Sequence, residues 1–258
     1  MPPPAHCIYQ VFEPGPTVEL LFDRHYLLYA AQGTIRLEAA GRRWTLPPTR
    51  AAWLKAGEPI RADIARPITC CSALFEPDWI TAPADVVTVF EMSVLAREMI
   101  LACRVWGPDW SGDDSYGLEM FRALSSTCLK AAEAPTNTWM PTGSSQIVRN
   151  ALDFTEEKLI ENITFGDVAS AAATSERSLA RRFADETGMT WRQAQRRLRM
   201  IRAVEALTHT SDTVTEVALS TGYNALSAFN AAFLEFSGET PTEYRKRIRT
   251  SRPVAKGA

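Results

Sequence analysis

Hydrophobic and polar positions divide the 258-residue chain into two parts with different periods. Up to about residue 76, apolar residues come in short, partly alternating runs, with turn residues such as Gln32-Gly33 and Pro47-Pro48 between them. Alternation with a period of two is typical of half-buried β-strands, and regular strand spacing is typical of an all-β sandwich or barrel. The pattern predicts strands in the runs TVELLF, HYLLYAA, TIRLEA, RRWTL, RAAWLK, IRADIA and ITCCSALF.

From about Glu91 the apolar residues recur three and four positions apart, which is typical of amphipathic helices. Residues 91–106 and 115–133 are expected to be helical and to flank the β-domain, where they either form a dimer interface or close the barrel. Residues 134–146, APTNTWMPTGSSQ, are expected to be a linker because they are rich in Pro, Thr, Ser and Gly. The remaining expected helices span residues 147–161, 165–172, 175–186, 190–208, 214–220, 225–236 and 241–248.

Composition and charge narrow the class of protein. The chain is 46% hydrophobic and 22% charged, as in a globular protein. No apolar run approaches the roughly 20 residues that span a bilayer, and residues 1–10 lack the features of a secretory signal. Residues 1–143 hold 12 Lys and Arg against 16 Asp and Glu, a net of −4, so the remaining residues carry +2 of the total −2. The two halves are therefore expected to face different partners.

The five cysteines argue for a reducing compartment. Their number is odd and no Cys-x-x-Cys occurs, so we expect buried thiols in a cytoplasmic protein rather than a disulfide framework. Redox sensing by the adjacent Cys70 and Cys71 remains an alternative.

The C-terminal half contains an internal repeat. The segment FGDVASAAATSERSLARRFADETGMT matches VTEVALSTGYNALSAFNAAFLEFSGETP at an offset of 49 residues in the first helix and 50 in the second. Each copy reads as helix, short turn, helix and closing turn, which predicts two helix-turn-helix motifs in tandem. Ala169, Leu179 and Phe183 would pack the first motif together. Its second helix would then present Arg177 and Arg181 outward, where arginine can contact guanine or phosphate. Alternatively, Arg181–Asp185 and Arg182–Glu186 are ordinary surface ion pairs.

These segments, together with RRLRMIRAVEAL and the closing GETPTEYR, resemble the AraC/XylS family of transcription regulators over residues 147–249. The resemblance implies that a long linking helix holds two recognition helices in successive major grooves. It places DNA contacts on Arg177, Ala180, Arg181, Arg182, Asn224, Leu226, Ser227 and Asn230. The chain departs from the family at Ala231, where Arg is usual, and at Leu226, where a polar residue is common. We therefore expect the first motif to dominate binding, unless the linking-helix residues Arg196, Arg197, Arg199 and Arg202 carry the phosphate contacts.

The stretch HYLLYAAQGTIRLEAAGRRWTLPPTRAAWLKAGEPI resembles the cupin-like domain that precedes this DNA-binding unit in the family. A cupin raises the alternative of a metal-dependent enzyme. The chain has three histidines, and Ile60 stands where a ligand histidine is frequent, so we expect no metal, no cofactor and no catalytic residue. His25 is expected to be structural. Tyr29 and Arg36 are the candidates for contacting a small-molecule effector.

The sequence therefore predicts a two-domain, cytoplasmic, non-enzymatic transcription regulator. A cupin-like β-barrel with flanking helices (1–133) precedes the linker, an all-α tandem helix-turn-helix domain (147–249) and a disordered tail (250–258). The expected partners are double-stranded DNA, an effector, a second copy in a homodimer and, for an activator, RNA polymerase.

Overall fold

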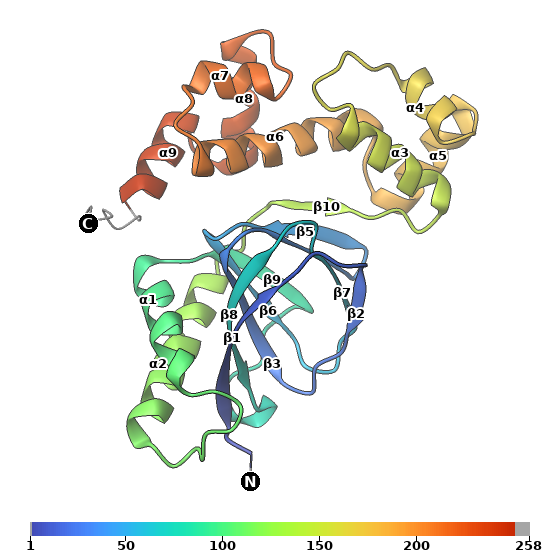
Figure 1. The fold of residues 1–258 in the computed structure, drawn as a ribbon. Helices are drawn as coiled ribbons and strands as arrows, with labels where there is room; N and C mark the ends of the chain where they lie inside the picture. Colours follow the sequence, from blue (N-terminus) through green and yellow to red (C-terminus); the bar gives the residue numbers. More distant parts are fainter. Residues whose placement is uncertain (1, 251–258) are drawn as a thin grey trace. The chain divides into compact units, whose positions relative to one another are not determined.

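The computed structural model describes residues 2–250, which separate into two compact units (Figure 1). The first unit comprises residues up to 40 and residues 44–136, and the second comprises residues 41–43 and those from 137 onward. Strands dominate the first unit, and the second is almost entirely helical. The predicted class, an all-β domain followed by an all-α domain, is confirmed.

Within residues 2–250, ten strands form two five-stranded sheets. The orders are β1-β8-β3-β6-β9 in the first sheet and β10-β5-β4-β7-β2 in the second. The strands are β1 (Ala5–Phe12), β2 (Val18–Leu20), β3 (His25–Gln32), β4 (Ile35–Ala39), β5 (Arg42–Leu46), β6 (Arg50–Leu54), β7 (Ile60–Asp63), β8 (Ile68–Phe75), β9 (Val87–Glu91) and β10 (Trp139–Pro141).

The two sheets stay separate and do not close into one continuous barrel, so of the two predicted forms, sandwich and barrel, the structure has the sandwich. In the described chain, β1 and β9 end the first sheet and β2 ends the second, each with a hydrogen-bonded neighbour on one side alone. The hydrophobic pattern predicts neither β1 nor β9. Strand β1 pairs antiparallel with β8 along its whole length, from Ala5 opposite Phe75 to Phe12 opposite Ile68.

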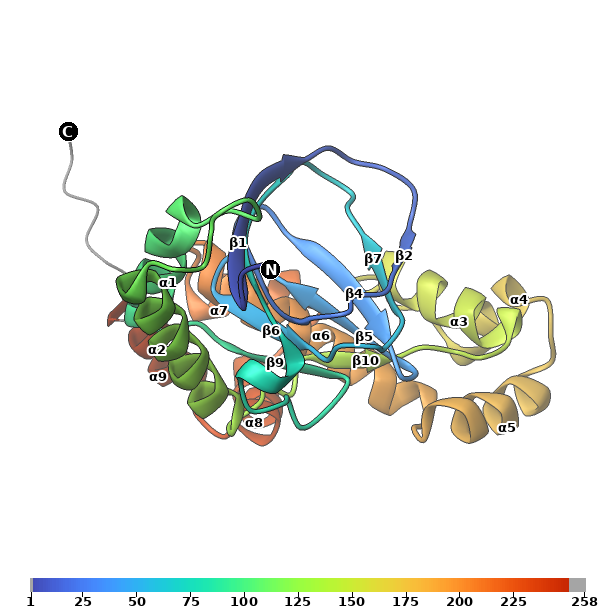
Figure 2. The same ribbon diagram turned by 90° about the horizontal axis from the view of Figure 1, so that it is seen from below.

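Helices cover one face of the first sheet. Helices α1 (Val94–Ala102) and α2 (Ser115–Ala132) lie beside this sheet in both views (Figures 1 and 2). Ile100 and Phe121 from these helices join Trp53 and Phe75 from the sheet in one buried cluster. The second sheet leaves one face in solvent, since Ile35, Leu37 and Ala39 on β4 are buried while Arg36 between them is exposed. Both expected helices are present, and the first begins at Val94 because β9 extends to Glu91.

The second unit contains the helices that the repeat predicts. They are α3 (Gln146–Glu157), α4 (Phe165–Ala171), α5 (Glu176–Thr187), α6 (Trp191–His209), α7 (Val214–Ser220), α8 (Leu226–Ser237) and α9 (Pro241–Thr250). The stretch expected to be a linker contains β10, which lies next to residues 41–43 through a bond from the Thr142 N–H to the Gly41 carbonyl (2.9 Å). The expected tail lies outside the described residues, except for Thr250 at the end of α9.

His25 has a structural role. It is buried, and its Nδ1 accepts a 3.1 Å hydrogen bond from the backbone N–H of Ala56. Burial lowers the pKa of His25 from 6.5, and the charge of Lys55 lowers it further. The neutral imidazole is therefore the form that the fold favours, which confirms the expectation of a satisfied histidine.

This burial makes the stability of the chain dependent on pH. Because the folded-state pKa of His25 is below 6.5, the unfolded state binds more protons in acid. We expect the free energy of unfolding to fall as the pH drops from 6.5 through the folded-state pKa. His25→Gln keeps an acceptor for Ala56 and does not titrate, so its stability should fall less over the same range. Denaturant titrations between pH 7.5 and 5 compare the two, and parallel pH profiles would contradict this role.

Candidate nucleic-acid interface

The first helix-turn-helix motif consists of α4, a tight turn and α5. The hydroxyl of Thr164 and the carboxylate of Asp167 cap α4 reciprocally, and Ser175 caps α5 by accepting from the Ser178 N–H. The turn between the helices places Ala173 in the left-handed region, with φ at 52°. Gly188, with φ at 67°, ends α5. Local sequence signals thus set both ends of α5.

Apolar packing fixes the orientation of α5. Ala169 on α4 and Leu179 and Phe183 on α5 are buried in one cluster with Trp191 and Leu198 of α6, as predicted. Because these positions occupy one side of α5, the opposite side faces solvent.

The solvent-facing side of α5 carries the predicted arginines. Arg177, Ala180, Arg181 and Arg182 are all exposed. Among the described residues, the three arginines form no hydrogen bond or ion pair, so the alternative of surface ion pairs with Asp185 and Glu186 is not realised. The Glu186 carboxylate instead accepts from the Ser145 N–H at 2.8 Å. The α5 guanidinium groups are therefore available to a ligand.

The second motif repeats this geometry. Thr213 and Glu216 form the capping box of α7 at the position of Thr164 and Asp167. Gly222 adopts a positive φ of 85° at the position of Ala173, and one more residue follows before the next helix begins. Gly238 ends α8 as Gly188 ends α5. Phe229 and Phe233 are buried where Leu179 and Phe183 are, so the predicted tandem repeat is present in the structure.

The outer side of α8 is neutral. Asn224, Leu226, Ser227 and Asn230 are exposed, and so is Ala231. Glu235 brings a negative charge to the last turn and forms an ion pair with Arg196 of α6. The α8 surface can offer hydrogen bonds and apolar contacts to base edges, but no cation of its own.

Because α5 carries exposed arginines and α8 carries no cation, we predict that Ala231→Arg strengthens DNA binding. Ala231 is exposed and corresponds to Arg181 in the repeat, so an arginine would meet no steric obstacle. One added base or phosphate contact contributes about 1–3 kcal/mol. Mobility-shift titrations should show tighter binding and a steeper salt dependence, and Ala180→Arg on α5 provides a matched added charge. An Ala231→Arg affinity no higher than that of the parent chain would contradict the assignment of this face.

Helix α6 joins the motifs. Its 19 residues extend about 28 Å at ~1.5 Å per residue, compared with about 34 Å between successive major grooves. Its arginines differ in their environments. Arg197 donates to the carbonyls of Trp139 (2.6 Å) and Asn137 (2.9 Å), and burial lowers its pKa to about 10. Arg197 is thus held by Trp139 of β10 and by Asn137 just before that strand. Arg192, which is not among the candidates from the sequence, is exposed.

The predicted effector residues lie in contrasting environments. Tyr29 is 2% exposed within the core beneath α1 and α2, and burial raises its pKa to about 12. Arg36 is exposed on the outer side of β4. Tyr29 has a clear packing role, and contact of either residue with an effector stays a prediction.

The structure does not bring together the two thiols that the redox hypothesis names, those of Cys70 and Cys71. Adjacent strand residues point to opposite faces, so Cys70 and Cys71 do not face each other. The Sγ of Cys71 instead lies 3.8 Å from the Sγ of Cys7, and both thiols are buried. The contact with Cys7 lowers the pKa of Cys71 and raises that of Cys7.

The described part of the chain has neither clustered metal ligands nor a membrane-spanning helix. No three His, Cys, Asp or Glu side chains come together there as metal ligands. None of its helices is long and apolar enough to cross a membrane.

Comparisons with known proteins agree with this geometry. The profile of a helix-turn-helix domain family matches residues 168–247. The transcriptional regulator NimR of Escherichia coli is 28% identical over 229 residues, which cover 88% of this chain and 81% of NimR. The transcriptional activator RhaS of Escherichia fergusonii is 32% identical over 91 residues, 35% of this chain and 33% of RhaS.

Two solved structures are also similar. ToxT from Vibrio cholerae aligns over 95% of this chain and 98% of its own, with 11% identity and a TM-score of 0.42. The C-terminal domain of AraT from Geobacillus stearothermophilus aligns over 45% of this chain and 94% of its own, with 26% identity and a TM-score of 0.40. The matched profile and these relatives show that the second unit carries a helix-turn-helix domain of the AraC type, and that the chain is similar over most of its length to a transcription regulator.

Proposed function

We propose that this protein recognises specific sequences in duplex DNA by inserting α5 and α8 into successive major grooves. The observation that carries the proposal is the exposed, unpaired arginine face of α5, held outward by the buried side chains of Leu179 and Phe183. Arginine binds guanine O6 and N7 in a bidentate manner, which is the commonest specific contact in the major groove. Arg177 and Arg181 lie one helical turn apart and suit such contacts.

In this proposal, the first motif contributes more to DNA affinity and recognition than the second. Arg177, Arg181 and Arg182 all lie on α5, whereas Ser227 and Asn230 on α8 are neutral. Cations supply much of the affinity for DNA because each phosphate contact releases counterions. The α8 side chains then add base preference, with Leu226 able to contact a thymine methyl group.

Selection from a pool of random duplexes tests the function. The full chain is immobilised, bound duplexes are amplified over several rounds, and the enriched sequences are read. We expect one motif with two conserved blocks about one helical turn apart. Unenriched sequences and equal affinity for all duplexes would reject specific recognition. Footprinting across a genome with the same protein then identifies target genes.

The first unit is the regulatory part of the proposal. It would bind an effector or form a homodimer, and it would perform no catalysis. Leu95 on α1 and Tyr116 on α2 are both 62% exposed, which supports these helices as the dimer surface. Light scattering measures the mass, and Leu95→Glu with Tyr116→Glu should convert a dimer to a monomer. The proposal places the protein in the cytoplasm, with RNA polymerase as a partner if it activates transcription.

A redox-responsive regulator is the second candidate function, because Cys7 and Cys71 are adjacent. Hydrogen peroxide would oxidise the two thiols to one disulfide and be reduced to two molecules of water. Mass spectrometry of peroxide-treated protein should then find a peptide linking Cys7 to Cys71, accompanied by changed DNA affinity. Free thiols at both positions after treatment would reject this candidate.

A further inference from the structure

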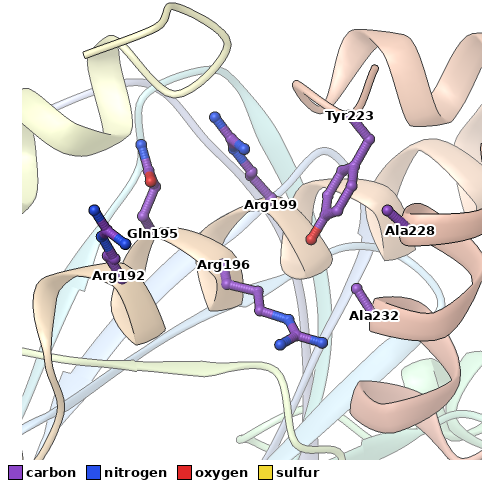
Figure 3. Close-up of a pocket in the computed structure, with 7 residues that line it drawn as sticks. All are labelled: Arg192, Gln195, Arg196, Arg199, Tyr223, Ala228 and Ala232. Carbon is purple, nitrogen blue, oxygen red and sulfur yellow. The ribbon is translucent and has the colours of Figure 1, made fainter. Parts of the chain in front are cut away.

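A hollow of about 360 Å³ lies within the second unit, between α6 and the second motif. Figure 3 shows four side chains that project from α6 on one side of the hollow, with the turn before α8 and α8 itself opposite. The lining residues are Arg192, Gln195, Arg196 and Arg199 of α6, Tyr223 of the turn, and Ala228 and Ala232 of α8.

Three cations share this side of α6. Arg192 and Arg196 are four residues apart and Arg199 follows after three more, so their side chains are neighbours on the helix surface. Like charges at this spacing repel each other, and the sequence therefore concentrates positive charge here against a local penalty. A negatively charged ligand in the hollow would relieve that repulsion.

The protein neutralises this charge incompletely. Arg196 pairs with Glu235, and Arg199 donates to the Leu159 carbonyl at 3.3 Å. Arg192 is exposed and forms no hydrogen bond or ion pair with any residue that the structure describes. Burial raises the pKa of Tyr223, so its hydroxyl is neutral near pH 7 and adds no negative charge. Among the described residues, Glu235 is thus the one carboxylate that forms an ion pair with any of these three guanidinium groups, and it pairs with Arg196.

The hollow lies beside α8, the helix that is proposed to enter the major groove of DNA. Ala228 and Ala232 form the flank of α8 that adjoins the outer side carrying Ser227 and Ala231. A helix with side chains is about 10–12 Å across, close to the ~12 Å width of the major groove. A helix inserted there has a phosphate backbone against its flank. The two alanines leave room for that backbone to approach the α6 arginines.

We propose that this hollow binds a phosphodiester group of the operator backbone beside α8, with Arg192 and Arg196 as its cations. The proposal rests on the proposed function and deepens it. Helix α6 supplies to the second motif the positive charge that α8 lacks. Ser227 and Asn230 then read bases while α6 holds the backbone in register.

The other α6 arginines provide a contrast. Arg197 is engaged by Trp139 and Asn137, so it is held away from a ligand. Arg202 is exposed and unpaired within residues 2–250, like Arg192, but it does not line the hollow. Arg202→Ala is therefore the matched control, since it removes the same charge from the same helix outside the proposed site.

The test measures DNA affinity of the full chain against salt concentration, with the duplex enriched by selection. Arg192→Ala should lower the slope of log K against log salt by about 0.9, the value for one phosphate contact. Adding Arg196→Gln should lower it by up to about twice that amount, while the selected base sequence stays the same. Arg192→Lys should restore most of the slope, and Arg202→Ala should leave it unchanged.

Methylphosphonate linkages locate the contact. Neutralising single phosphates beside the second conserved block should weaken the parent chain at one or two positions and leave the Arg192→Ala, Arg196→Gln protein unaffected there. If the double variant has the same salt slope as the parent chain, the proposed phosphate contact is overturned. Specific DNA binding, and with it the proposed function, would still stand. A parent chain that binds no duplex would overturn both together.

Inorganic phosphate distinguishes a free anion from the DNA backbone as the source of the ligand. Calorimetric titration of the full chain without DNA should show no saturable phosphate binding at millimolar concentration. Saturable binding that Arg192→Ala abolishes, combined with an unchanged DNA slope, would assign the hollow to a small anion and overturn the backbone contact.

Discussion

Replacing both Arg177 and Arg181 with alanine is expected to reduce DNA binding to a weak, sequence-independent level. The two side chains are exposed, unpaired among the described residues and one turn apart on α5. Each base contact of this kind contributes about 1–3 kcal/mol, and each phosphate contact adds about one unit to the salt slope. Losing both should therefore remove most of the preference for the selected duplex and lower the slope by up to about two units.

The matched comparison is Ser227→Ala with Asn230→Ala on α8. These residues occupy the repeat positions of Arg177 and Ala180 and carry no charge. Their loss should weaken binding less and leave the salt slope unchanged. Binding isotherms at several salt concentrations measure both effects. If the α8 pair proved more damaging than the α5 pair, the second motif would be the dominant reader.

Phe233→Ala is expected to cause the largest loss of stability in the second unit. Phe233 is fully buried, lies 5.8 Å from the Phe229 ring and 5.5 Å from the Tyr244 ring, and holds α8 against its neighbours. Truncating a buried phenylalanine costs about 3–5 kcal/mol, a large fraction of the 5–15 kcal/mol that stabilises an ordinary domain. We expect an early loss of helical circular dichroism in denaturant, together with weaker DNA binding.

Leu234→Ala is the control on the same helix. Leu234 is 47% exposed, so its truncation should cost well under half as much as that of Phe233. Equal losses at the two positions would show that α8 does not pack through Phe229 and Phe233, and the orientation of its outer face would have to be reassigned.

The second unit could be predicted well because its signals are local. Capping threonines, closing glycines and apolar residues at helical spacing set the ends and faces of α4, α5 and α7 within a few residues of each position. The offsets of 49 and 50 residues correspond to a real difference, the extra residue in the turn between α7 and α8. The outer face of α5 follows directly from the burial of Leu179 and Phe183.

The first unit was harder to predict because its sheets depend on distant pairing. Strand β1 was missed, since its partner β8 lies more than 50 residues away and three of its eight residues are exposed. Strand β9 is not predicted because Val87–Glu91 runs directly into the apolar spacing from which a helix is expected from Glu91 onward. Whether the strands close into a barrel depends on edge pairing, which no local pattern specifies.

For the hollow beside α8, too, the local spacing of residues can be predicted from the sequence, whereas the distant contacts cannot. The spacing of Arg192, Arg196 and Arg199 is visible in the sequence, and it could have suggested a cationic stripe. Their difference from Arg197 could not be seen, because it depends on the contacts of Arg197 with Asn137 and Trp139, about 60 residues away. The nearness of Cys71 to Cys7 rather than to Cys70 is likewise a result of strand pairing.

Methylation interference at guanine N7 tests most directly the central claim that α5 and α8 enter successive major grooves. N7 lies in the major groove, so a methyl group there blocks a helix that reads the base. With the selected duplex and the full chain, we predict two clusters of interfering positions about 10 base pairs apart, the stronger of which is weakened in the single variant Arg181→Ala. Interference confined to one cluster, or unchanged in that variant, would contradict the account.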